Sequence, residues 1–143
     1  MRILAITPVF VNTIPDRLEG GVLYVCEQYK IAAHKCCCGC GEEVITPLTP
    51  ADWSIRKEGN VVSLMPSIGN WSFNCKSHYW ISRNNVVWAG NMSQRQIDQV
   101  KARDRVDKEI YIAAINRQKE QQHARPDSVV AKLWQALMRW WNS

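Results

Sequence analysis

The chain has 143 residues, a formal net charge of +5 and six cysteines, which suits one small domain with an appended segment. The charge is diffuse and no basic run with interleaved aromatic residues occurs, so no nucleic-acid partner is expected. The sequence also predicts neither a membrane-spanning helix nor a signal peptide, because Thr7-Pro8 ends the apolar N-terminal run. In the cytoplasmic location that this indicates, clustered cysteines point to a metal or to catalysis, not to disulfides.

Composition changes sharply near residue 90. Residues 1–90 hold all seven glycines, all six cysteines and five of the six prolines, whereas residues 91–143 have one proline and no glycine or cysteine. Turn residues punctuate β architectures, and their loss is typical of continuous helix. The sequence therefore predicts a β domain at residues 1–90 and a helical extension at residues 91–143.

Short apolar runs bounded by turn residues follow one another through the first 90 residues. Strands are expected at 3–12 (broken by Pro8), 22–26, 30–34, 42–46, 53–57, 61–65, 79–83 and 86–88. Glu58-Gly59-Asn60 and Asn84-Asn85 are expected hairpin turns, because glycine and asparagine accept positive φ. This pattern predicts a mainly β domain, either a short-stranded sheet or a partial barrel. The four tryptophans of this part are assigned to its thin core in preference to a binding groove: Trp53, Trp71, Trp80 and Trp88.

Two helices are expected in the extension, at about 93–121 and 128–141. Ser93 and Gln96 form a capping box for the first helix, and Arg125-Pro126-Asp127 separates it from the second. The second helix has an apolar stripe at helical spacing, made of Val130, Leu133, Trp134, Leu137, Met138 and Trp141. It is too short to span a bilayer. It is expected to pack on its own domain or on a second subunit, with a partner enzyme's groove and a membrane surface as alternatives.

The cysteines form the strongest motif of the chain. Four of them lie within His34-Lys35-Cys36-Cys37-Cys38-Gly39-Cys40-Gly41, and Cys75-x-x-His78 follows later, while Cys26 lies alone on an expected strand as a small buried residue. Zinc knuckles are tight turns that glycine allows, and tetrahedral zinc needs four ligands, so six cysteine or histidine side chains compete here. Buried free thiols and a redox Cys-x-x-Cys are the alternatives, although no helix follows the motif to lower a thiol pKa. Structural zinc is favoured over catalytic zinc, which keeps an open coordination position.

A second candidate site is Pro66-Ser67-Ile68-Gly69-Asn70. Ser67 is expected in a loop whose backbone amides form an oxyanion hole. Together with His78 or His34 it would supply the Ser–His pair that nucleophilic hydrolysis needs, and Asp52 is a conceivable orienting carboxylate. The same residues are also ordinary turn chemistry. A histidine three residues after a cysteine is, in addition, a common metal ligand.

Both motifs resemble a bacterial family of small cysteine-rich domains known as a domain of unknown function. The residues that carry the resemblance run from Ala33 to Leu48 and from Pro66 to Ile81. It covers about residues 1–90 and leaves out the helical extension. Members of that family are encoded beside ubiquitin-like proteins and their activating and conjugating enzymes, in ubiquitination-like operons. The resemblance implies a serine-type, deubiquitinase-like peptidase of such an operon.

The family's His-x-Cys-x-Cys-Gly-Cys-Gly pattern implies a four-cysteine zinc set and frees two histidines for catalysis beside Ser67 or Ser77. The implied zinc ligands are Cys36, Cys38, Cys40 and Cys75, and the implied histidines are His78 and His34. The sequence is therefore interpreted as a zinc-stabilised serine peptidase that processes or deconjugates a bacterial ubiquitin-like protein. A non-catalytic zinc-ribbon adaptor of the conjugation system, and a structural module whose tail mediates assembly, are the alternatives.

Overall fold

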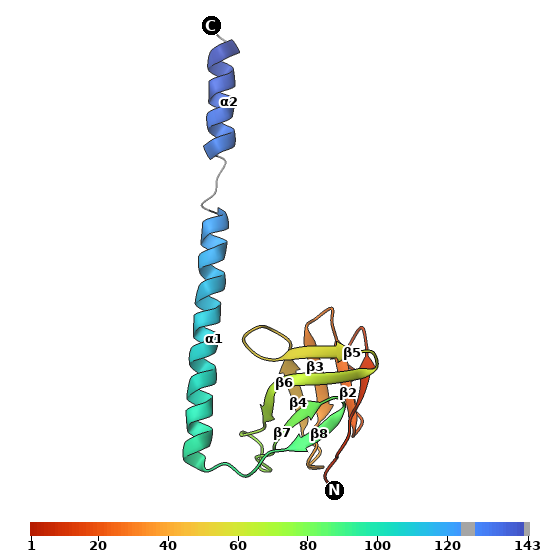
Figure 1. Cartoon of the computed structure of the whole chain (residues 1–143). Helices are drawn as coiled ribbons and strands as arrows, with labels where there is room; N and C mark the ends of the chain where they lie inside the picture. Colours follow the sequence, from red (N-terminus) through yellow and green to blue (C-terminus); the bar gives the residue numbers. More distant parts are fainter. Residues whose placement is uncertain (124–127, 142–143) are drawn as a thin grey trace. The chain divides into compact units, whose positions relative to one another are not determined.

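The computed structural model describes residues 1–123 and 128–141 (Figure 1). The chain divides into two compact units, Met1–Arg103 and Asp104–Ser143, and each is described here by itself. The strands are β1 (Thr7–Phe10), β2 (Val22–Cys26), β3 (Ile31–Lys35), β4 (Glu43–Pro47), β5 (Ser54–Glu58), β6 (Val61–Gly69), β7 (His78–Ser82) and β8 (Asn85–Trp88). The helices are α1 (Gln94–His123) and α2 (Ser128–Trp141). The expected fold class, mostly β with a helical tail, is confirmed.

The eight strands form two four-stranded sheets with the orders β1-β2-β3-β4 and β5-β6-β7-β8. All neighbouring strands are antiparallel except β1 and β2, which pair in parallel. A parallel pair needs a crossover connection, and the segment between β1 and β2 supplies it. Leu18 of this segment is buried with Tyr24 and Ala33 in a small second core.

The main core contains buried side chains from both sheets. One sheet contributes Leu23, Val25, Ala32 and Val44, and the other contributes Val62, Leu64, Ile68, Tyr79, Ile81 and Val86. Buried residues alternate with exposed or half-buried ones along β4, β6, β7 and β8, as expected for strands with one buried face. Strands β2 and β3 are instead buried on both faces, because Tyr24 and Ala33 pack in the second core. The N-terminal segment links the two sheets, because the Ile6 amide donates to the Asn84 carbonyl and the Thr7 amide donates to the Gly21 carbonyl, each at 2.8 Å.

Two local predictions are wrong. Strand β6 continues past residue 65 to Gly69, so Ser67 lies on a strand and not in a loop. Pro66 has no amide hydrogen to donate to a neighbouring strand, so the sequence predicted that the strand ends before it. The pairing of β6 with β7 shifts register between Leu64 and Ile68, and this irregularity accommodates the proline. The second hairpin turn is Arg83-Asn84, with φ of 48° and 65°, because β8 already begins at residue 85.

The helical tail begins with the expected capping box. The Ser93 amide donates to the Gln96 side chain at 2.8 Å, and the Gln96 amide donates back to the Ser93 hydroxyl at 3.4 Å. Ile97 of the first turn is buried. In α2 the large apolar side chains are at least 59% exposed: Leu133, Trp134, Leu137, Met138, Trp140 and Trp141. The side chain of Val130 lies outside the described residues. No helix in the described ranges has the length and apolar character needed to cross a membrane, and the packing partner of α2 stays a prediction.

Candidate functional site

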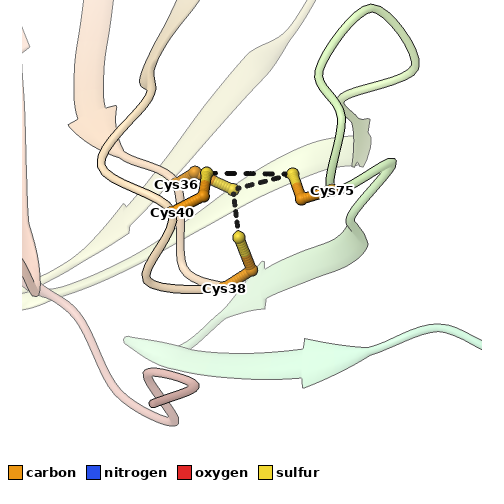
Figure 2. Close-up of side chains that lie close together, drawn as sticks. All are labelled: Cys36, Cys38, Cys40 and Cys75. Atoms are coloured by element: carbon orange, nitrogen blue, oxygen red, sulfur yellow. Dashed lines mark hydrogen bonds between the residues drawn. The ribbon is translucent and has the colours of Figure 1, made fainter.

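Four cysteine side chains lie close together (Figure 2) in the first unit, Met1–Arg103, which is called the β unit below. Cys36, Cys38 and Cys40 lie in the turn between β3 and β4, and Cys75 lies in the connection between β6 and β7. The turn curls tightly because Gly39 and Gly41 adopt φ of 87° and 89°, which disfavours side chains. All four sulfurs lie within 4.8 Å of one another.

These sulfur distances fit a tetrahedral metal ion. Thiolates held at about 2.3 Å from zinc lie about 3.8 Å apart. The Cys36 sulfur lies 3.4 Å from that of Cys38 and 3.9 Å from that of Cys75, and the Cys40 and Cys75 sulfurs are 3.8 Å apart. Burial raises the pKa of the Cys36 and Cys38 thiols, whereas hydrogen bonding with Ser77 outweighs burial at Cys75 and lowers the pKa of that thiol to about 7. The four cysteines can therefore hold a metal ion.

The other two cysteines lie outside this cluster. Cys37 is fully buried, and burial raises the pKa of its thiol to about 11, which leaves it protonated and inert. Cys26 is also fully buried, and its sulfur donates to the Asn12 carbonyl at 3.2 Å. The cluster thus draws one ligand from the β6–β7 connection and three from the β3–β4 turn, and a bound ion would cross-link the two sheets.

A serine and a histidine meet on the second sheet. The Nε2 atom of His78, on β7, lies 2.9 Å from the Oγ atom of Ser67, on β6. Their neighbours Ile68 and Tyr79 are paired across the two strands and buried in the core. Since successive side chains of a strand point to opposite faces, the pair lies on the face away from the core. Burial lowers the pKa of His78 below its ordinary value of 6.5, so the ring is neutral at neutral pH and can accept a proton.

Two tryptophans flank His78. The ring centroid of Trp71 lies 4.9 Å from that of His78, and the ring centroid of Trp80 lies 5.3 Å from it. Trp80 is 40% exposed, so its assignment to the core is wrong. Trp80 shares the face of His78 because it follows two residues later on the same strand, a spacing from which the sequence could have indicated this contact. His78 thus has two aromatic neighbours, Trp71 and Trp80.

Gly69 allows Trp71 to reach His78. Gly69 lies opposite His78 in the strand register, and a methyl group at this position would overlap the indole ring of Trp71. We expect Gly69→Ala to displace Trp71 and to lower the rate at which a fluorophosphonate labels Ser67 by about tenfold or more, because small displacements in a reacting pair are costly. Intact-protein mass spectrometry over time would measure this rate.

The matched control for this variant is Gly20→Ala. A methyl group at Gly20 would meet only the Ile3 side chain, at 4.0 Å, and should leave the labelling rate unchanged. A Gly69→Ala protein that retains its metal and reacts at the rate of the natural chain would show that Trp71 does not position His78.

His34 is not brought to Ser67. It is fully buried, its Nε2 atom lies 2.8 Å from the Tyr79 hydroxyl, and burial lowers its pKa to about 4. Because Tyr79 and His78 are successive residues of β7, the His34–Tyr79 pair lies on the core side of the sheet and the Ser67–His78 pair on the other side.

Ser77 lies with the cysteines. Its hydroxyl oxygen is 3.0 Å from the Cys36 sulfur and 3.5 Å from the Cys75 sulfur. The side-chain amide of Asn70 donates to the same hydroxyl at 2.8 Å and to the Tyr79 hydroxyl at 3.4 Å. Asn70 thus connects the cysteine cluster to the core, a role that nothing in the sequence motif indicated.

Two groups that the sequence suggested would assist Ser67, the backbone amide of Asn70 and the carboxylate of Asp52, do not do so. The backbone amide of Asn70 donates to the Ser77 carbonyl at 2.9 Å and so cannot serve an oxyanion hole. The Nδ1 atom of His78 has no hydrogen-bond partner among the described residues, so Asp52 does not orient this ring. Asp52 instead accepts a hydrogen bond from the Thr49 hydroxyl at 2.7 Å.

Comparison with known proteins identifies the family. No curated protein and no solved structure matches the chain. The family described as bacterial ubiquitination-like system serine protease (BubE) matches residues 10–89, more than half of the chain. The match includes the four clustered cysteines, Ser67 and His78, and it ends before α1. The resemblance noted in the sequence is confirmed, and the chain belongs to the bacterial ubiquitination-like system serine protease (BubE) family.

Proposed function

We propose that this chain is a serine peptidase that cleaves the bond after the C-terminus of a bacterial ubiquitin-like protein. It would mature that protein or detach it from targets, beside the activating and conjugating enzymes of the same system. The observation that carries the proposal is the 2.9 Å contact between Ser67 and His78 on the face of the sheet away from the core. A nucleophile paired with a neutral base is the minimum that acyl transfer requires. The family described for residues 10–89 supports the same chemistry.

The reaction would proceed through an acyl-enzyme. The Ser67 oxygen attacks the carbonyl carbon at the C-terminus of the ubiquitin-like protein while His78 Nε2 takes the hydroxyl proton. The C–N bond then breaks, and the imidazolium gives its proton to the leaving amine. A water molecule, deprotonated by the same histidine, attacks the ester carbonyl and releases the carboxylate product and free Ser67.

Aromatic contacts would take the place of an orienting carboxylate in this pair. Trp71 and Trp80 both contact the imidazole ring and would restrain its orientation. A bulge leaves its extra residue outside the interstrand ladder, and we expect amides of the irregular stretch between Leu64 and Ile68 to hold the oxyanion.

We further propose that the metal of the cysteine cluster is a structural zinc ion. Its ligands would be Cys36, Cys38, Cys40 and Cys75, whose sulfur separations match tetrahedral thiolate coordination. When bound, zinc would cross-link the β3–β4 turn to the β6–β7 connection. Ser77 and Asn70 would support the thiolates by hydrogen bonds and keep the chain that precedes His78 in place.

A fluorophosphonate probe tests the proposed nucleophile without knowledge of the substrate. We expect the probe to form one covalent adduct, mapped by peptide mass spectrometry to Ser67, because only an activated serine reacts readily. A protein unfolded in denaturant should not react. An adduct on Ser77, or no adduct on a folded, metal-loaded chain, would rule out Ser67 as the nucleophile.

The pH dependence of that labelling reports the base. Because burial holds the pKa of His78 below 6.5, its neutral form persists into mildly acidic solution. The midpoint of the labelling rate against pH should therefore lie below 6.5, and the rate should fall on the acidic side of that midpoint as the ring becomes protonated. Circular dichroism over the same range checks that the fold persists. A midpoint at or above 6.5 in a folded protein would contradict the assignment.

A further inference from the structure

A pocket of about 220 Å³ lies next to His78 within the β unit. This volume is far above the share of about 30 Å³ that one water molecule occupies. Trp71 and Trp88 line it, as do the residues that follow β8, from Ala89 to Met92. Ser67 is not among the residues that line it, whereas His78 both lines the pocket and contacts Ser67.

Two cationic side chains line the pocket beside two of the clustered cysteines, Cys38 and Cys75. Arg2 and Lys76 line it, and its lining contains no aspartate or glutamate. The Arg2 guanidinium lies 4.6 Å from the ring centroid of Trp88, and the Lys76 ammonium donates to the Gln94 side chain at 3.4 Å. Neither cation takes part in a salt bridge within the described part of the chain. Two positioned cations without a carboxylate partner favour an anionic ligand.

The place of the pocket relative to the chemistry identifies which part of a substrate would enter it. The histidine of a serine peptidase gives its proton to the leaving amine, so the leaving group lies beside the histidine. Across the sheet, Ser67 lies on one side of His78, and Ala89 lies on the other side, where its amide donates to the His78 carbonyl at 2.9 Å. The pocket therefore lies next to the histidine that would protonate the leaving amine, at the strand edge where Ala89 meets His78.

We infer that this pocket is a subsite for a carboxylate on the leaving-group side of the cleaved bond, bound by Arg2 and Lys76. That the pocket is a subsite of the peptidase depends on the proposed function. That it binds a carboxylate does not. A short C-terminal extension of a ubiquitin-like precursor ends in such a carboxylate, and an acidic side chain supplies the same group. The two cations have one rival role, which is to neutralise the nearby thiolates of Cys38 and Cys75.

The first test measures binding alone. Fluorescein-labelled tetraglycine with a free C-terminal carboxylate, and the same peptide with a C-terminal amide, are titrated into the full chain carrying Ser67→Ala and followed by anisotropy. The free acid should bind about five- to tenfold more tightly, as expected of charge-assisted hydrogen bonds at a partly exposed site, and added salt should reduce the difference. A labelled Gly-Gly-Asp-Gly amide and its Asn counterpart distinguish an acidic side chain from a chain terminus. Equal affinity of acid and amide in both comparisons would overturn the inference.

Variants then assign the effect to the two cations. Arg2→Gln and Lys76→Gln should each bring the acid-to-amide ratio toward one, while Arg2→Lys retains most of it. The control Arg17→Gln removes the same charge from the surface outside this pocket and should leave the ratio unchanged. If the glutamine variants lose metal and leave the ratio unaltered, the cations serve the thiolates and the subsite does not exist. If the natural chain is not labelled by the fluorophosphonate, the peptidase proposal is rejected. The binding of a carboxylate in this pocket would still hold.

Discussion

Replacing Ser67 by alanine should lower cleavage of a ubiquitin-like protein fusion by about 10⁴-fold or more, because the acyl-enzyme cannot form without its oxygen. The change removes one hydroxyl from a half-buried position, so folding and metal content should be unchanged. His78→Gln should have a similar effect, since glutamine cannot accept and return the proton. Gel and mass-spectrometric assays of a C-terminal fusion to the ubiquitin-like protein of the same operon would measure the loss.

Two serine variants separate nucleophile from scaffold. Ser63→Ala changes another half-buried serine of β6, whose hydroxyl accepts a hydrogen bond from the Arg83 amide at 2.9 Å, and should cleave within a few-fold of the natural rate. Ser77→Ala removes a hydroxyl that contacts two of the clustered sulfurs and should weaken metal binding before it affects chemistry. A Ser67→Ala enzyme with normal turnover would end the peptidase proposal in this form and favour the adaptor role.

The sequence predicted the fold class because its signals are local. Alternation, turn residues and the capping box each act over a few positions, and the hairpin at Gly59-Asn60 and the first turn of α1 follow from them. The division into two sheets, and the parallel pairing of β1 with β2, depend on contacts between distant segments. No local pattern encodes such a pairing, so the sequence suggested only a sheet or partial barrel.

The candidate site shows the same division between local and distant information. The knuckle at residues 36–41 is local and was recognisable, whereas spacing alone left Cys37 and His78 as possible ligands. Which sulfurs meet depends on where the β6–β7 connection places Cys75, and which side of the sheet a histidine occupies depends on register. The proline at position 66 concealed the strand that carries Ser67. Successive side chains of β7 point to opposite faces of the sheet. This alone would have indicated that His78 and Tyr79 lie on different faces and that His78 and Trp80 share one.

The cysteine cluster and the Ser67–His78 pair are linked through the short connection between β6 and β7, whose residues Asn70 and Ser77 form hydrogen bonds next to the cluster. Asn70 follows Gly69 at the end of β6, and its side chain donates to Ser77, which directly precedes His78. Ser77 in turn contacts the sulfur of Cys36. A bound metal would thus hold the short connection that carries Trp71 and delivers His78 to the sheet, which explains why a site without catalytic chemistry of its own would matter for activity.

Removing the metal should unfold the β unit. We expect the purified chain to contain about one zinc ion, and a strong chelator to lower its thermal midpoint by about 20 °C or more, because binding free energy at structural zinc sites is largely folding free energy. The main core draws on both sheets, and the cluster joins one turn from each, so loss of the ion releases a cross-link between them. Elemental analysis and melting curves with and without chelator measure both quantities.

Cys40→Ser isolates the contribution of the metal from that of packing. The Cys40 side chain is exposed, so the substitution itself disturbs almost no buried surface, yet it removes one of four ligands. It should therefore reproduce most of the chelator effect. Cys26→Ala makes the opposite change, a lost buried sulfur with all four ligands retained, and should keep its zinc while losing about 1–2 kcal/mol of stability. If Cys40→Ser melts like the natural chain and Cys26→Ala does not, the unit is stabilised by its core alone and the cysteines at 36–40 and 75 have another purpose.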